Sequence, residues 1–431
     1  MLSTEFRVAV ERAWDGVWSS GVTNPITVSD LLGTILMVGG PNSFNEWDSL
    51  SAATSANNSE EIARVLSAVR RNHGLEPGAE IESAEFWRDA EPLRRAMTAL
   101  QFLHAKALGT DVLGDVYEHV LSKLSLAGQF GQFRTPRHIV EFMVEIADPN
   151  EDDLVLDPAC GTAGFLVAAS AYRRDKGRSG AYEGIEIDRT VARIAGANLT
   201  FHGVENGRIH IADGLGPGER RADVILANPP FAGSVSADVV DRFVVRSRKS
   251  ELLFLEKMAS LLKSGGRAVV VVPYGVVTGG GVAGRSIRSM LVRGNSLRAV
   301  VELPSGVFRP YTDVKTAILV WEAVPGGSAT HMVRVEQDGL SLDQRRVPVA
   351  QNDLPEALTV LAGSDARIAH RLVSTEEIEA AALNLNPSRY LGDDETTYAR
   401  EFDPEDVLDG MAARLTTMLD KVVRLHQEVK Q

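Results

Sequence analysis

Residues 154–174 read LVLDPACGTAGFLVAASAYRR and determine the expected fold class. A short apolar run ends in Asp157, a glycine-containing turn follows, and an apolar segment of helical length begins near Gly164. The same order of strand and helix continues in YEGIEID (182–188), TVARIAGANLTFHG (190–203), RIHIAD (208–213) and DVILA (223–227). Short strands that alternate with helices of this length predict an α/β fold with a doubly wound, mainly parallel sheet.

The alternation continues downstream. LLFLEKMASLLKSGG (252–266) predicts a helix that ends at its glycines, and RAVVVVP (267–273) predicts the next strand. LRAVVELP (297–304) and KTAILVWEA (315–323) are further apolar segments of the same pattern. We therefore expect the sheet to end near residue 325.

The segments on either side of the sheet have helical patterns. Residues 1–130 are expected to form an N-terminal helical domain, since segment 110–124 places one apolar stripe on a helix: Val112, Leu113, Val116, Val120, Leu121 and Leu124. Residues 131–345 hold the sheet, and residues 346–431 form a C-terminal extension. Its last part, 404–431, repeats apolar side chains as a heptad: Leu408, Met411, Leu415, Met418, Val422, Leu425 and Val429. This heptad predicts a helical tail that packs either on its own domain or on a partner helix.

The composition limits the class of protein. The 431 residues carry 45 basic and 58 acidic side chains, a formal net charge of −13. A protein that holds DNA alone usually has a basic footprint. Either DNA is not the substrate, or another chain supplies much of the contact. The single cysteine, Cys160, excludes a disulfide framework and a cysteine-based zinc cluster, which suits the cytoplasm. We expect no signal peptide, no membrane span and no metal.

LANPPF (226–231) raises a question about chemistry, because it places Asn228 and Phe231 directly after an apolar run. Pro229 and Pro230 lack the N–H donors that a strand ladder needs, so the strand must stop there. One interpretation is a plain strand-terminating turn, for which Asn-Pro is common. The other is a rigid corner that presents an amide and an aromatic ring to a ligand.

The ends of the first three strands predict a nucleoside site. Gly161 and Gly164 allow a ligand to approach the backbone, and a helix N-terminus follows. Glu186, near the end of the second strand, is placed to accept hydrogen bonds from ribose hydroxyls. Asp213 ends the third strand within reach of an adenine ring. The G-x-G-x-x-G spacing of a dinucleotide site is absent, so an adenosine-containing cofactor fits better.

Together these segments are similar to a known family. DPACGTAGFL (157–166), GIEID (184–188) and NPPF (228–231) resemble the cofactor and catalytic motifs of the adenine-N6 DNA methyltransferases. GQFRTPRHIV (131–140) resembles an additional cofactor motif in the modification subunits of type I restriction–modification systems. ELPSGVFRPYTDVKTAILVWE (302–322) and NLNPSRYL (384–391) look like later segments of the same family. The resemblance covers roughly residues 100–395.

The resemblance implies a Rossmann-like methyltransferase domain that binds S-adenosyl-L-methionine. Asn228 and the carbonyl of Pro229 would accept the two hydrogens of the target amine, and Phe231 would stack on the flipped base. Asp157 would orient the glycine loop, and Glu186 would bind the ribose. Two segments would hold the rest of the cofactor: Gln132, Phe133, Thr135, Pro136 and Arg137 would close over it, and Thr162, Ala163 and Gly164 would lie near its methionine end.

The resemblance also implies partners. The substrate would be double-stranded DNA with a flipped adenine. A separate specificity subunit would read the sequence, because little of the chain is left for a module that reads base edges. A restriction subunit with nuclease and translocase activity could complete the complex. DRFVVRSRKS (241–250) concentrates basic side chains just after the corner and would either touch phosphates or form a solvated face: Arg242, Arg246, Arg248 and Lys249.

Three alternatives stay open. The chain could be a solitary adenine methyltransferase or serve another phage-defence system. A glutamine-N5 protein methyltransferase carries a similar Asn-Pro-Pro corner, although tyrosine usually follows where this chain has Phe231. An inactive scaffold of the same fold is the third alternative, and a cofactor-binding titration would separate it from an enzyme.

Overall fold

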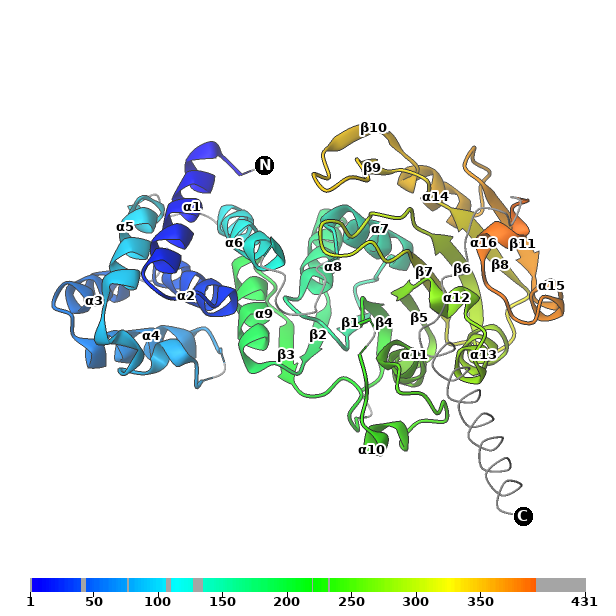
Figure 1. The fold of residues 1–431 in the computed structure, drawn as a ribbon, viewed down its shortest axis with the longest axis horizontal. Coiled ribbons are helices and arrows are strands. Elements are labelled where there is room, and N and C mark those ends of the chain that lie inside the picture. Colours follow the sequence, from blue (N-terminus) through cyan, green and yellow to red (C-terminus); the bar gives the residue numbers. More distant parts are fainter. Residues whose placement is uncertain are drawn as a thin grey trace, which may run out of the picture.

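A large mixed sheet forms the centre of the molecule (Figure 1). The computed structural model describes residues 2–39, 44–75, 77–105, 110–126, 135–218, 220–231 and 233–392. Within these residues a nine-stranded sheet has the order β11-β8-β6-β7-β5-β4-β1-β2-β3. Its strands are β1 (Leu154–Asp157), β2 (Ala181–Glu186), β3 (Gly207–Ile211), β4 (Ala222–Ala227), β5 (Leu262–Pro273), β6 (Ser296–Glu302), β7 (Thr316–Glu322), β8 (Ala329–Arg334) and β11 (His370–Ser374). The predicted α/β fold is confirmed.

The direction of the strands places several of their carboxyl ends at one edge. β3, β2, β1, β4 and β5 run parallel, whereas β7 lies antiparallel between β5 and β6. The order reverses at β1, which pairs with β2 on one side and β4 on the other. In open α/β sheets this reversal opens a crevice beyond the carboxyl ends of the strands, where ligands bind.

The sheet extends beyond residue 325, so the expected end was wrong. β8 pairs parallel with β6, and β11 pairs antiparallel with β8. Met332, Val333 and Val373 of these two strands are fully buried. Their pairing partners lie tens of residues away along the chain, and such pairing leaves little signal in a short sequence window. A separate two-stranded ribbon joins β9 (Asp338–Leu340) to β10 (Pro348–Asn352).

The glycines at 265 and 266 lie inside a strand, which corrects the expected helix end. Helix α11 (Ser250–Leu261) stops earlier and passes directly into β5. Gly265 has a φ of +77°, which favours glycine, and a Cβ on Gly266 would lie 2.9 Å from the carbonyl oxygen of Asp223. The two glycines thus let β5 approach β4 where their register shifts.

Helices cover both faces of the sheet, as a doubly wound fold requires. In β4, Val224 and Leu226 pack into one core, and Ile225 and Ala227 into the other, because successive side chains point to opposite faces. The first core includes α7 (Arg137–Ala147), α8 (Gly164–Asp175) and α14 (Leu354–Leu361), and the second includes α11 and α13 (Val282–Ser289). Shorter elements connect them: α10 (Ala237–Val240), α12 (Gly275–Thr278), η3 (Met290–Gly294), α15 (Thr375–Ala380) and α16 (Pro387–Tyr390).

The N-terminal helices form a lobe beside the β3 end of the sheet (Figure 1). They are α1 (Thr4–Ser19), α2 (Pro25–Val38), α3 (Phe44–Ser55), α4 (Ser59–Asn72), α5 (Glu91–Ala105) and α6 (Thr110–Leu126), with short turns η1 (Glu80–Glu82) and η2 (Phe86–Arg88). Their core continues into α9 (Arg189–Phe201), which follows β2. Asp30 of α2 also pairs with Arg70 at 2.9 Å and lies 3.8 Å from Arg193 of α9, all buried. The lobe is therefore fixed to the sheet through α9.

The apolar stripe predicted for residues 110–124 is confirmed in α6. Leu113, Val116, Val120 and Leu121 are buried in the core of the lobe. The predicted heptad helix of residues 404–431 lies outside the described residues. Among the residues that the structure describes, no helix is long and apolar enough to span a bilayer.

Candidate active site

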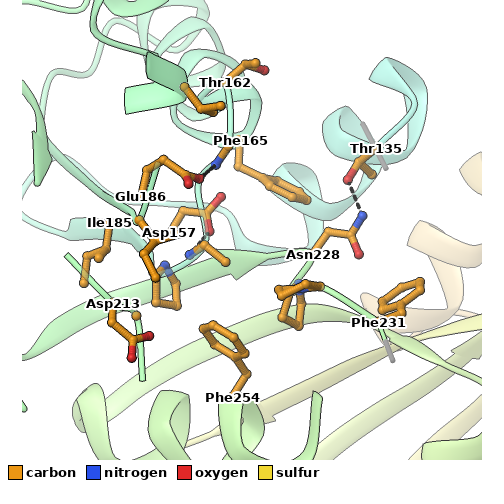
Figure 2. A pocket seen from close by; sticks show the side chains of 18 of the residues that line it. Thr135, Asp157, Thr162, Phe165, Ile185, Glu186, Asp213, Asn228, Phe231 and Phe254 are labelled. Carbon is orange, nitrogen blue, oxygen red and sulfur yellow. Dashed lines mark hydrogen bonds between the residues drawn. The ribbon is translucent and has the colours of Figure 1, made fainter. Parts of the chain in front are cut away.

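A cavity of about 280 Å³ lies at the carboxyl ends of β1, β2 and β4. We call it the central cavity. Figure 2 shows the carboxylates of Asp157, Glu186 and Asp213 on one side of it, and Asn228 and Phe231 on the other. The structure brings together these predicted site residues in its lining: Thr135, Asp157, Gly161, Thr162, Glu186, Asp213, Asn228, Pro229, Pro230 and Phe231.

Other predicted site residues lie elsewhere. Pro136 precedes α7 as its N-cap residue, and Arg137 is exposed and pairs with Glu141 at 2.8 Å. Arg137 and Gly164 line a neighbouring cavity between α6, α7 and α8 rather than the central one. Ala163 is fully buried. Gln132 and Phe133 lie outside the described residues.

The glycine loop after β1 is held by two carboxylates. Asp157 accepts a hydrogen bond from the N–H of Ala159 at 3.0 Å, and Glu186 accepts one from the N–H of Gly161 at 3.1 Å. Ala163, just before α8, has a φ of +65°, a left-handed conformation that is uncommon for a residue with a Cβ. The loop is thus fixed in one strained shape, which is typical of functional sites.

Burial raises the pKa values of the two carboxyl groups beneath this loop. Desolvation raises the pKa of Asp157 to about 8, and the neighbouring Glu186 charge adds to the shift. Burial also raises the pKa of Glu186, although backbone N–H groups that bond its carboxylate oppose part of the effect. The pKa of the buried Cys160 thiol rises well above its usual range for the same reason. A buried carboxyl with a perturbed pKa in a cleft is a candidate for ligand binding.

The corner after β4 is held by hydrogen bonds to two distant segments. The side-chain amide of Asn228 donates from Nδ2 to the hydroxyl of Thr135 at 2.9 Å (Figure 2). The hydroxyl of Ser250, the first residue of α11, donates to the carbonyl of Pro230 at 3.0 Å. Because Thr135 takes the amide nitrogen, the amide oxygen of Asn228 faces away from it. The side chain can therefore present a hydrogen-bond acceptor from a fixed position.

Sequence reasoning missed the apolar part of the lining. Phe165, Ile185, Ile187 and Phe254 also line the central cavity. Ile187 is 66% exposed although it follows a buried strand, and its place directly after Glu186 could have identified it. The N-terminal lobe contributes three further apolar residues to the lining: Ile26, Leu121 and Leu124. Leu121 and Leu124 belong to the predicted apolar stripe of residues 110–124, but that stripe did not indicate a cavity. These flat and branched side chains suit a heteroaromatic ring.

The charge of the lining restricts the ligand. Among the described residues, the central cavity has three acids and no lysine, arginine or histidine. A dinucleotide would place its anionic pyrophosphate beside the carboxyl groups of Glu186 and Asp213, which would disfavour it, whereas their negative charge would attract a cationic adenosine derivative. No group of three potential metal ligands occurs among the described residues.

Comparisons with known proteins point the same way. The family model described as N-6 DNA Methylase matches residues 108–398. The type I restriction enzyme EcoEI methylase subunit of Escherichia coli is 34% identical over 224 residues, which cover 48% of this chain and 46% of that subunit. The StySPI methylase subunit of Salmonella potsdam is 31% identical over 233 residues, covering 48% and 44%. The chain thus spans about half the length of the curated relatives it matches.

Solved structures share the fold over more of the chain. A chain from a structure of the type I R-M system has a TM-score of 0.72 at 24% identity, covering 98% of this chain and 97% of that one. The type I restriction-modification system methyltransferase subunit from Streptococcus thermophilus has a TM-score of 0.67 at 18% identity, covering 90% and 99%. At these identities the likeness shows the fold, which includes the helical N-terminal lobe.

Proposed function

Because this chain belongs to the N-6 DNA methylase family, we propose that it transfers a methyl group from S-adenosyl-L-methionine to the N6 amine of adenine in DNA. One observation carries the proposal. The central cavity joins an acidic, glycine-rich end to the Asn228 corner, so a cofactor site and an amine site share one space. We also propose that the chain is the modification subunit of a type I restriction–modification complex.

The acidic end of the cavity fits the cofactor. S-adenosyl-L-methionine, when bound, supplies an electrophilic methyl group on a positively charged sulfur. Glu186 would accept hydrogen bonds from the ribose hydroxyls while it holds the N–H of Gly161. Asp213, exposed at the rim, would face the adenine ring of the cofactor, with Ile187 and Phe254 against its faces. Thr162 would lie near the methionine end.

The corner would act on the target base. The exocyclic amine of adenine is a poor nucleophile because its lone pair is delocalised into the ring. The amide oxygen of Asn228 and the carbonyl of Pro229 would accept its two hydrogens and draw the nitrogen towards tetrahedral geometry. This would free the lone pair for attack on the methyl carbon. The carbon–sulfur bond would break as the carbon–nitrogen bond forms, which leaves a neutral thioether, and the surplus proton on the nitrogen would then pass to water. Such catalysis rests on positioning and polarisation, so an amide suffices without a general base.

Thr135 would orient the catalytic amide. If the amide turned over, its N–H₂ group would face the amine hydrogens and repel them. The hydrogen bond from Asn228 Nδ2 to Thr135 Oγ1 would hold the amide in the productive orientation. Thr135 lies in the middle of the segment that resembles a cofactor motif (131–140), so one residue connects the cofactor side of the cavity to the amine side. It is a positioning residue rather than a catalytic one.

Phe231 would receive the extruded base. A base inside a duplex cannot reach the cavity, and extrusion costs a few kcal/mol. Stacking of a base on an aromatic ring returns about 1–3 kcal/mol. The ring of Phe231 is half-buried at the edge of the core that contains β4, so one face remains available. Pro229 and Pro230 limit the motion of the backbone that carries it.

The acidic charge supports the need for partners. A net charge of −13 opposes binding to a polyanion, so a separate specificity subunit would supply sequence reading and much of the DNA contact. The predicted heptad tail gives this subunit a helix to pack on. A restriction subunit would join the same complex, and the activity would be cytoplasmic, where the thiol of Cys160 stays reduced.

A direct assay tests the function. The full chain, alone and with the proposed specificity subunit, is incubated with duplex DNA and with cofactor that is labelled in the methyl group. The DNA is then digested to nucleosides. Label in N6-methyl-2′-deoxyadenosine supports the proposal, whereas label in protein glutamine would identify the rival methyltransferase. Cofactor binding without any transfer, in the presence of the partner, would identify an inactive scaffold.

A further inference from the structure

The segment that follows the catalytic corner is tied to it. We call residues 233–249 the corner loop. Its base is closed by Ser250, whose N–H donates to the carbonyl of Gly233 at 3.0 Å and whose hydroxyl bonds Pro230. The two strands of the base also pair at Ser234 with Lys249 and at Val235 with Arg248. The loop then projects from the body of the molecule at α10 (Figure 1). Its position is thus coupled to that of Phe231.

After α10, the corner loop returns to the body of the molecule and holds one valine in solvent. Val244 is 88% exposed, whereas its neighbours Phe243 and Val245 are 8% and 5% exposed and belong to the core. The N–H groups of Val244 and Val245 both donate to the carboxylate of Glu256 in α11, at 2.7 and 2.8 Å. A single exposed valine is common on protein surfaces. This one is different because two charge-assisted hydrogen bonds fix its backbone.

Basic side chains lie close to this valine in the sequence. The corner loop has four basic and two acidic side chains, a net charge of +2 in a chain whose total is −13. Arg242 lies 3.7 Å from Asp238, and Arg246 lies 2.9 Å from Asp241, in pairs that are largely exposed. Exposed pairs of this kind contribute little to stability, so phosphates can replace the acids at small cost. Arg248 is exposed beside them.

An exposed apolar side chain in a basic loop matches the chemistry of duplex DNA. The base stack offers apolar surface in the interior, and phosphates line both strands outside. Proteins that distort DNA insert side chains of this kind between base steps, with basic residues on the flanking phosphates. We propose that Val244 enters the base stack beside the target adenine, while Arg242, Arg246 and Arg248 hold the adjoining phosphates. The inference rests on the proposed function and adds a contact that it does not require.

The insertion would lower the cost of base extrusion. When adenine leaves the stack, its neighbours lose a stacking surface and its partner thymine loses its hydrogen bonds. A valine in the vacated space restores apolar contact to the neighbouring bases. The two hydrogen bonds to Glu256 fix the backbone at Val244. The closed base of the corner loop ties this segment to the corner that carries Phe231. Extrusion into the cavity and insertion from the loop would then occur together.

The test compares two duplexes with the full chain and its DNA-reading partner. In one duplex the target adenine faces thymine, and in the other it faces an abasic site, from which extrusion is easier. We expect Val244→Ala to lower the rate of methyl transfer to the paired adenine by about tenfold and to leave transfer to the unpaired adenine nearly unchanged. Val324→Ala is the matched control, since Val324 is 43% exposed and follows the end of β7, at the opposite edge of the sheet.

Each outcome decides the inference. Transfer to the paired adenine at the rate of the control variant would overturn it. An equal loss on both duplexes would overturn it too, because the loop would then act in general binding and not in extrusion. Loss of the partner from the purified complex would identify a protein-binding loop instead. If the unsubstituted complex methylated neither duplex, the proposed function itself would fail. This result is distinct from the others, because it is seen before any residue is substituted.

Discussion

At the scale of single residues, we propose that the hydroxyl of Thr135 orients the side-chain amide of Asn228. Thr135→Val keeps the shape of the side chain but removes the acceptor of the bond from Asn228. A hydrogen bond of this kind contributes about 1 kcal/mol, so we expect kcat to fall roughly fivefold, with a smaller change in KM for DNA. Steady-state kinetics on duplex DNA measure both.

Thr135→Ser is the control, because serine keeps the hydroxyl. It should restore most of kcat. A valine variant with an unchanged kcat would show that the amide is oriented by other contacts, and a serine variant as slow as the valine variant would point to the lost methyl group instead.

Asp157 predicts a pH dependence at the same scale. Its pKa is about 8 in the fold, against 3.8 for the ordinary group. Between these values the unfolded chain ionises Asp157 while the folded chain keeps it neutral, so its contribution to folding stability is complete below pH 4 and is lost as pH rises towards 8. Asp157→Asn does not titrate. We expect the stability of the asparagine variant relative to the native chain to grow by up to about 1.4 kcal/mol per pH unit.

Thermal melting of the cofactor-free proteins at pH 5, 6, 7 and 8 tests this. The two proteins share all other titrating groups, so the difference in their stability at each pH reports the ionisation of Asp157. A difference that stayed constant over this range would show that Asp157 is already ionised in the fold.

At the scale of elements, the contact between β2 and the glycine loop determines the shape of the cofactor end. Gly184 of β2 leaves room for Cys160, because a Cβ there would lie 2.7 Å from its sulfur and 2.9 Å from Ile209. We expect Gly184→Ala to destabilise the fold by about 1–3 kcal/mol through overpacking and to weaken cofactor binding by displacing the loop. Chemical denaturation and calorimetry measure the two effects. Gly218→Ala is the control, because a Cβ there meets open space, and it should change neither stability nor cofactor affinity. A Gly184→Ala protein with the same stability and the same affinity for the cofactor as this control would contradict the account.

How far the sequence predicts each element depends on how local its signal is. β1, β2 and β4 carry the apolar run, the acid or the corner within a few adjacent residues, so their ends and the residues Asp157, Glu186 and Asn228 could be predicted. β8 and β11 join the sheet through partners far along the chain. The bond between Thr135 and Asn228 spans 93 residues. Such contacts depend on the finished fold, and a single sequence does not contain them in readable form.

At the scale of the whole molecule, we propose from the acidic charge that the chain binds DNA together with a partner, and that the predicted heptad of residues 404–431 is its docking element. About three heptads are marginal as an isolated helix in water, so packing must stabilise them. We expect a chain without residues 404–431 to fold and to bind S-adenosyl-L-methionine, but to lose co-purification with the specificity subunit and sequence-specific methylation. Pull-down and methylation assays on the truncated chain measure this. Full assembly and full activity would make the tail a surface helix of its own domain.

The central claim is that Asn228 acts on the target amine and not on the cofactor, and one variant tests it most directly. Asn228→Ala is prepared in the full chain with its partner, and two quantities are measured: the affinity for S-adenosyl-L-methionine by calorimetry, and the single-turnover rate of methyl transfer to duplex DNA. The account predicts a cofactor affinity within about twofold of the native value and a transfer rate reduced by at least about a hundredfold, the scale for loss of one polarising group. Near-normal transfer by the alanine variant would contradict it.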